Sequence, residues 1–242
     1  MSFSRDYKEY ETVESRKQKA EKSVEKLKKK KKELQPVIIT GKKIATTWWG
    51  KSWNDNLERY SDYENRIGRG RSYVKNGAVL DLKITQGNVE ALVQGSRVKP
   101  YKVSITIDPL KKEIWEKIVN DCEGKIESLQ ELLEGKFPAE LSELLTAKDK
   151  GLFPSPQEIY FECSCPDWAS MCKHVAAVLY GVGARLDSNP ELFFLLRDVN
   201  IDELISESVN KKSQSLLQKS QKKSDRVIDD EDISGVFGID IC

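Results

Sequence analysis

The most regular pattern in the chain is an alternation of hydrophobic and polar positions between residues 78 and 107. Three stretches, residues 78–84, 89–93 and 101–107, carry hydrophobic side chains at every second position, which predicts β-strands with one buried face. Gly87 marks a turn between the first two stretches. We therefore expect a small antiparallel sheet packed on one side.

Hydrophobic residues at helical spacing predict helices on either side of this sheet. Trp49, Trp53, Leu57 and Tyr60 form one stripe, which we interpret as the buried face of a helix and not as a base-stacking surface. Asp108-Pro109 predicts the start of another helix, with the aspartate as its cap. Further helices are expected over residues 13–34, 126–135, 138–145 and 175–186, and again after Asn189 and Asn200.

Residues 159–165 alternate again and end in a Cys-x-Cys pair. Because side chains two apart on a strand point to one side, Cys163 and Cys165 would aim both sulfurs in one direction. After a Pro166-Asp167-Trp168 turn, Cys172 and His174 precede an apolar helix whose first turn would return them to the same point. The predicted unit is two short strands, a turn and a helix.

Composition limits the classes of function. The chain has 242 residues, enough for a sizeable core, and its 40 basic and 39 acidic side chains nearly cancel, so only local clusters of charge bear on nucleic-acid binding. No apolar run is long enough to span a bilayer, and the N-terminus lacks the apolar centre of a secretory signal. We expect a cytoplasmic protein with no membrane partner, in which clustered cysteines indicate a metal site and not disulfides.

Two segments are locally basic. Residues 16–33 carry ten basic and three acidic side chains, so they form either a phosphate-binding arm or a solvated helix. Residues 66–77 carry glycines at positions 68 and 70 and predict an open basic loop, which either contacts nucleic acid or a partner or is a solvated turn. The candidate contact residues are Arg66, Arg69, Arg71, Lys75, Arg97, Lys99, Trp168 and Lys173.

Two nucleotide-binding motifs are incomplete. Gly50-Lys51-Ser52 resembles the end of a phosphate-binding loop, but Ala45 occupies the position of its first glycine. In the dinucleotide pattern G-x-G-x-x-G, Tyr73 replaces the last glycine. We therefore expect no small-molecule substrate.

The strongest chemical signal is the spacing C-x-C-x(6)-C-x-H formed by Cys163, Cys165, Cys172 and His174. Thiolates and imidazole are the ligands that zinc prefers, and four of them close a structural site, whereas catalytic zinc usually keeps one position open. A Cys172/His174 nucleophile pair is the enzymatic alternative, but no third orienting group is evident. The prediction is one structural Zn²⁺ whose binding is coupled to local folding.

The sequence C-S-C-P-D-W … C-K-H-V-A-A-V-L-Y resembles the SWIM zinc finger, in which a C-x-C pair is followed after a variable gap by C-x-H. The segments WWGKSW, RGRSYVKNGAVLDL, VQGSRVKPY and LFPS extend the resemblance to bacterial SWIM zinc finger family proteins over about residues 44–185. The resemblance implies that Cys163, Cys165, Cys172 and His174 are the zinc ligands. It also implies a module for DNA or protein interaction, often encoded with or fused to Swi/Snf-type helicase ATPases.

These patterns predict an α+β protein, with a small antiparallel sheet packed with helices and a zinc-stabilised strand–strand–helix SWIM finger. The expected segments are a basic helical extension (1–36), a sheet region with basic loops (37–108), a helical region (109–156), the finger (157–187), C-terminal helices (188–210), and a linker with an acidic and apolar tail (211–242).

The leading functional hypothesis is a non-enzymatic zinc protein that binds DNA or RNA or assists a Swi/Snf-type ATPase. The alternative is a protein-interaction adaptor without nucleic-acid contact, in which the finger and the apolar end of the chain hold a partner. A hydrolase or nuclease is disfavoured because no second ligand set or acid–base group is visible.

Overall fold

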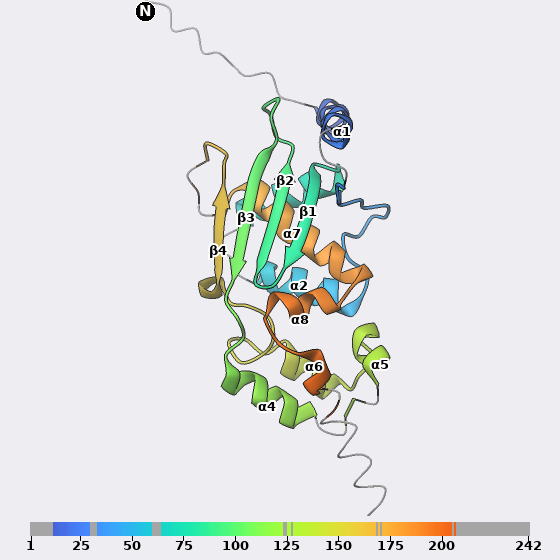
Figure 1. The fold of residues 1–242 in the computed structure, drawn as a ribbon, viewed down its shortest axis with the longest axis vertical. Helices are drawn as coiled ribbons and strands as arrows, with labels where there is room; N and C mark the ends of the chain where they lie inside the picture. Colours follow the sequence, from blue (N-terminus) through green and yellow to red (C-terminus); the bar gives the residue numbers. More distant parts are fainter. Residues whose placement is uncertain are drawn as a thin grey trace, which may run out of the picture.

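The computed structural model describes residues 12–29, 33–59, 64–122, 125–126, 128–167, 169, 171–204 and 206. Its helices and strands form the α+β arrangement expected from the sequence (Figure 1). In chain order the elements are α1 (Val13–Lys28), α2 (Trp48–Glu58), α3 (Glu64–Lys75), β1 (Val79–Thr85), β2 (Asn88–Val93), β3 (Tyr101–Ile107), α4 (Lys112–Cys122), α5 (Leu129–Glu134), α6 (Ala139–Leu145), the 3₁₀ turn η2 (Pro156–Glu158), β4 (Ile159–Cys163), α7 (Lys173–Ser188) and α8 (Glu191–Leu196).

The sheet is antiparallel with the order β1-β2-β3-β4. The three strands predicted from the alternation are confirmed. Gly87 lies in the turn between Thr85 and Asn88, where its φ of 64° is a conformation that glycine adopts without strain. The fourth strand, β4, comes from the predicted finger and pairs with β3 through Ile105 and Phe161.

The prediction of two short strands within the finger is wrong for the residues that the structure describes. Among the described residues between positions 157 and 187, β4 is the only strand. Its partner is β3, some 60 residues earlier, because the hydrophobic side of β4 completes the buried face of the main sheet. The segment predicted as a finger is therefore continuous with the body of the protein.

Helix α7 is the centre of the hydrophobic core. It packs against the sheet, α2 and α3, and eleven of its sixteen residues are buried. Small residues allow this close approach: a Cβ added to Gly70 of α3 would lie 2.5 Å from the Cβ of Ala176, and one added to Gly50 of α2 would lie 2.5 Å from the Gly183 carbonyl oxygen. The position of α7 is thus set by contacts on several sides.

The tryptophans of α2 are core residues, as predicted. Trp49 and Trp53 are buried, and their indole nitrogens donate hydrogen bonds to the backbone oxygens of Leu132 and Leu179. Leu57 is buried on the same stripe, whereas Tyr60 lies outside the described residues. These hydrogen bonds satisfy the polar atom of each buried indole.

Three predicted element boundaries are wrong. The N-terminal helix ends at Lys28 and not near residue 34. The helix expected to start at Asp108 begins at Lys112, and the backbone N–H groups of Asp108 and Leu110 donate to the carbonyl oxygens of Glu158 and Arg197. Ile126 precedes its helix, which begins at Leu129, while the predicted stop at Gly135 is confirmed.

The basic segment 66–77 is not an open loop. It forms most of α3, and Gly70 lies against α7, so this glycine permits close helix packing where the sequence suggested flexibility. Ile67, Tyr73 and Val74 are buried. Their spacing is helical, but the glycines and arginines between them hid this pattern in the sequence.

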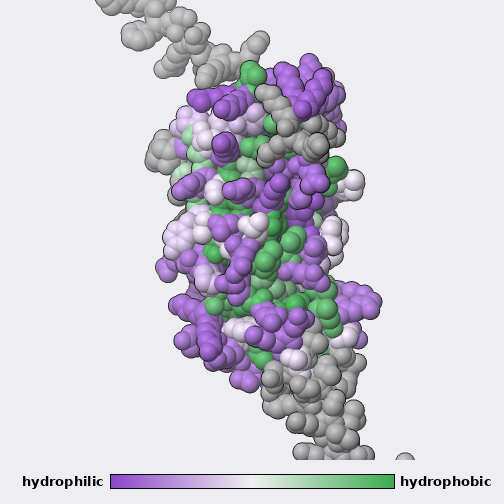
Figure 2. Space-filling model, viewed as in Figure 1, coloured by the Kyte–Doolittle hydropathy of each residue, from purple (hydrophilic) through white to green (hydrophobic). Residues whose placement is uncertain are grey.

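The sheet face opposite α7 is open to solvent. A groove of about 560 Å³ runs across it and is lined by alternating acidic and basic side chains, including Lys83, Glu90, Lys102 and Glu162. Figure 2 shows mainly polar side chains on this side of the molecule, with hydrophobic atoms visible between them. Among the described helices, none combines the length and the hydrophobicity needed to cross a bilayer.

Candidate metal centre

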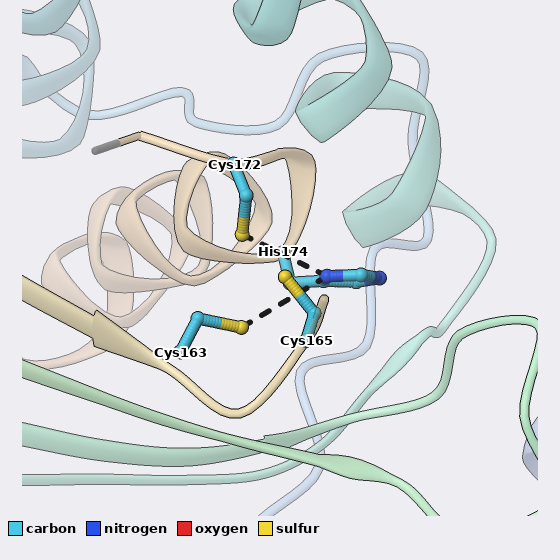
Figure 3. A group of neighbouring side chains, drawn as sticks. All are labelled: Cys163, Cys165, Cys172 and His174. Carbon is cyan, nitrogen blue, oxygen red and sulfur yellow. Dashed lines mark hydrogen bonds between the residues drawn. The ribbon is translucent and has the colours of Figure 1, made fainter. Parts of the chain in front are cut away.

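The Cys and His side chains meet where the sheet reaches the first turn of α7. Cys163 is the last residue of β4, Cys172 is the N-cap of α7, and His174 lies in the first turn of that helix. Cys165 lies in the turn after β4. Figure 3 shows the three sulfur atoms and the imidazole pointing toward a common point.

Ser164 holds the Cys-x-Cys turn against the sheet. Its N–H donates to the carbonyl oxygen of Lys102 at 3.0 Å, and its hydroxyl accepts from the Lys102 N–H at 2.9 Å. The backbone between the two cysteines is therefore anchored to β3. This anchoring fixes the backbone positions from which the Cys163 and Cys165 side chains extend.

The distances suit one tetrahedral ion. The four potential ligand atoms all lie within 4.8 Å of one another. Nδ1 of His174 is 3.7 Å from the Cys172 sulfur and 4.0 Å from the Cys163 sulfur. With zinc–sulfur bonds of about 2.3 Å and zinc–nitrogen bonds of about 2.0 Å, a tetrahedron requires about 3.5 Å between nitrogen and sulfur. A small contraction would bring all four onto a metal ion, so the residues present fit zinc.

The metal-free thiols share protons unequally. The hydrogen bond with Cys163 lowers the pKa of Cys172 to about 3, although burial acts in the opposite direction. The same hydrogen bond, together with burial, raises the pKa of Cys163 far above its ordinary value, and burial raises the pKa of Cys165. These shifts favour Cys172 as the thiolate of the metal-free cluster, with the protons on Cys163 and Cys165.

His174 is held by aromatic rings. Its ring centroid lies 4.5 Å from that of Tyr101 and 5.4 Å from that of Tyr73, and the side chain is only 3% exposed. The second ring nitrogen, Nε2, is buried and has no hydrogen-bond partner among the described residues. Gly95 lies beside it, because a Cβ added there would fall 2.9 Å from Nε2.

The turn between Cys165 and Cys172 is connected to α3 by an ion pair. The Arg66 guanidinium donates to a carboxylate oxygen of Asp167 at 2.9 Å, and the other oxygen of Asp167 accepts from the Ala169 N–H at 3.3 Å. Arg66, which the sequence assigned to an external partner, thus supports the turn that carries the cluster.

The other candidate contact residues occupy different environments. Arg71 forms an ion pair with Glu58 and donates to the Tyr180 hydroxyl, so it is also engaged within the protein. Lys173 is half-buried, with its ammonium 5.5 Å from the centre of the Tyr73 ring. Trp168 lies outside the described residues. The exposed members of the set are Arg69 and Lys75 on α3, and Arg97 and Lys99 in the β2–β3 loop.

Sequence reasoning missed the residues that surround His174. Tyr73 belongs to the segment predicted as a basic loop, and Tyr101 to a predicted strand. The alternation of β3 predicted that Tyr101 is buried, but no pattern in the sequence indicated that its ring faces the histidine.

The chain is similar to a protein that is itself uncharacterised. It is 34% identical over 164 residues to the uncharacterised protein Rv2102 of Mycobacterium tuberculosis, a match that covers 67% of this chain and 59% of the relative. The chain therefore spans about three-fifths of that relative's length. No protein-family model matches the chain, and no solved structure matches it.

Proposed function

We propose that Cys163, Cys165, Cys172 and His174 bind one structural zinc ion as a SWIM-type finger in a non-enzymatic protein. The observation that carries the proposal is the convergence of their four ligand atoms within 4.8 Å, from β4, the following turn and the start of α7. An ion held there would join the edge of the sheet to the central helix.

A structural role is favoured over a catalytic one by the ligand count. Three thiolates and one imidazole fill a tetrahedron and leave no position for an activated water. Cys172 and His174 are also buried, at 1% and 3% exposure, so half of the ligand set is away from solvent. Chemistry on a substrate would require the loss of a ligand.

We further propose that the end of the molecule near this finger contacts nucleic-acid phosphates, either alone or beside a Swi/Snf-type ATPase. The β2–β3 loop carries the exposed Arg97 and Lys99, and the lysine-rich α1 lies at the same end (Figure 1). Ser23 of α1 donates to Gln94 at the end of β2 at 2.7 Å, which places the helix beside this loop. Two basic segments far apart in sequence thus face one region, and clustered cations bind phosphates by releasing counterions.

Metal analysis tests the first proposal. The purified wild-type chain is expected to contain one zinc per molecule, and Cys165→Ser is expected to lose most of it. Cys122→Ala is the matched control, because Cys122 is a buried thiol on α4 outside the cluster. Absence of stoichiometric zinc in the wild type would end the proposal.

A salt titration of nucleic-acid binding tests the second. Lys99→Glu is expected to weaken binding to a DNA or RNA duplex and to flatten its salt dependence by about one unit of log–log slope or more. Lys112→Glu makes the same charge change on α4, at the opposite end of the molecule, and should have a smaller effect (Figure 1). If the zinc-loaded protein binds neither DNA nor RNA at low salt, the protein-interaction adaptor replaces the nucleic-acid proposal.

A further inference from the structure

The environment of His174 departs from the usual pattern of zinc sites. A metal-bound histidine normally donates its second ring N–H to a carboxylate, a carbonyl or water, and this bond fixes the orientation of the ring. Here Nδ1 faces the sulfurs, while Nε2 is buried and has no carboxylate or carbonyl partner in the part of the chain that the structure describes. Something else must therefore keep Nδ1 directed at the metal position.

Packing supplies this constraint from several sides. The rings of Tyr101 and Tyr73 lie on the imidazole, the former tilted by 39° and the latter nearly edge-on at 74°. The backbone of Gly95 lies beside Nε2, and a Cβ at that position would come within 2.9 Å of Nε2 and 2.4 Å of Tyr101 Cε2. The imidazole thus occupies a slot that a single added carbon would fill.

This slot is itself held in place. The buried Gln94 side chain donates to the carbonyl oxygens of Gly95 and Arg97, which fixes the backbone where β2 ends. The guanidinium of Arg97 lies 5.9 Å from the centre of the Tyr101 ring. The segment from Gln94 to Tyr101 therefore forms a wall of the metal centre, although it supplies no ligand.

We infer that Gly95 and Tyr101 are positioning residues for the metal centre: they direct Nδ1 of His174 at the ion by shape, in place of the usual hydrogen bond to Nε2. The inference rests on the proposed zinc site and assigns part of its ligand geometry to a segment distant in sequence. It requires that the metal bind Nδ1, that Nε2 carry the proton, and that side-chain volume at Gly95 disturb the site.

Cobalt substitution and histidine-selective nitrogen NMR test this directly. His174 is the only histidine in the 242-residue chain, so ¹⁵N-histidine labelling gives one pair of ring signals. In zinc-loaded wild type we expect a metal-bound Nδ1 and a protonated Nε2. Gly95→Ala is expected to change the cobalt d–d spectrum and to weaken zinc binding at least tenfold in competition with a chromophoric chelator.

Two controls separate positioning from general damage. Gly68→Ala adds the same methyl group at a position with nothing within 4 Å, and should leave the cobalt spectrum and zinc affinity unchanged. If Gly95→Ala fails to fold, variants of Tyr101 provide the test. Tyr101→Phe keeps the aromatic ring and should retain the wild-type cobalt spectrum. Tyr101→Leu removes the flat ring surface and should alter that spectrum.

The outcomes are distinguishable. A wild type that binds neither zinc nor cobalt would remove the metal site and the inference together. Metal bound through Nε2, or a wild-type spectrum and affinity in folded Gly95→Ala, would overturn the inference while leaving the zinc proposal intact. If Gly95→Ala does not fold, a wild-type spectrum in Tyr101→Leu has the same consequence.

Discussion

Zinc binding to the metal-free protein should release about two protons, and not three. Three cysteines would become zinc-bound thiolates, but the hydrogen bond with Cys163 already lowers the pKa of Cys172 to about 3, so that sulfur has no proton to lose at neutral pH. The pKa values of Cys163 and Cys165 are raised, so both remain thiols until the metal displaces their protons.

The magnitude follows from this proton count. Two displaced protons make the logarithm of the zinc affinity rise by about two for each pH unit, which is about 2.7 kcal/mol of binding free energy per unit. The gain is lost as the pH falls, because protons compete with the metal for Cys163 and Cys165.

A pH indicator in weakly buffered solution at about pH 7.5 measures the release, and chelator competition at several pH values measures the slope. Cys165→Ser should release about one proton per bound metal, since one thiol is missing, while Cys122→Ala should still release about two. Release of about three protons by the wild type would show that Cys172 is protonated in the metal-free cluster, and would refute the shared-thiolate arrangement.

The remaining predictions concern stability and can be measured by denaturant unfolding of the zinc-loaded protein. Burial raises the pKa of Glu158, but the hydrogen bonds from the buried Arg197 and from Ser155, together with the charge of Arg197, outweigh it, so the pKa of this carboxyl is lowered in the folded state. Glu158→Gln should therefore cost about 2 kcal/mol at pH 7, a loss that disappears as the pH falls below about 4, and an equal loss at acid pH would contradict this. Gly70→Val should cost about 3 kcal/mol by overpacking the α3–α7 contact, where a Cβ already meets Ala176 at 2.5 Å, whereas Gly68→Val should cost less than about 1 kcal/mol; equal losses would show that the contact relaxes. Asp187→Asn should cost about 1–2 kcal/mol, because both carboxylate oxygens accept hydrogen bonds from Thr46 and Thr47 at the start of α2, and no loss would mean that solvent replaces them.

Local patterns predicted a large part of this fold because each depends on a few neighbouring residues. The alternation that placed Val103, Ile105 and Ile107 on one face of a strand is confirmed by their burial. The stripe of Trp49 and Trp53 predicted a buried helix face for the same reason. Where a glycine had a second role, the local rule failed: Gly70 suggested an open loop, but it lies within α3.

The spacing of the candidate metal centre was likewise visible in the sequence, because Cys163, Cys165, Cys172 and His174 lie within twelve positions. Only the tertiary structure shows that β4 pairs with β3 and that Gly95, Tyr73 and Tyr101 surround His174. The physical reason is range: strand alternation and ligand spacing are properties of adjacent residues, whereas the shape of the slot around His174 depends on close packing between segments up to about a hundred positions apart.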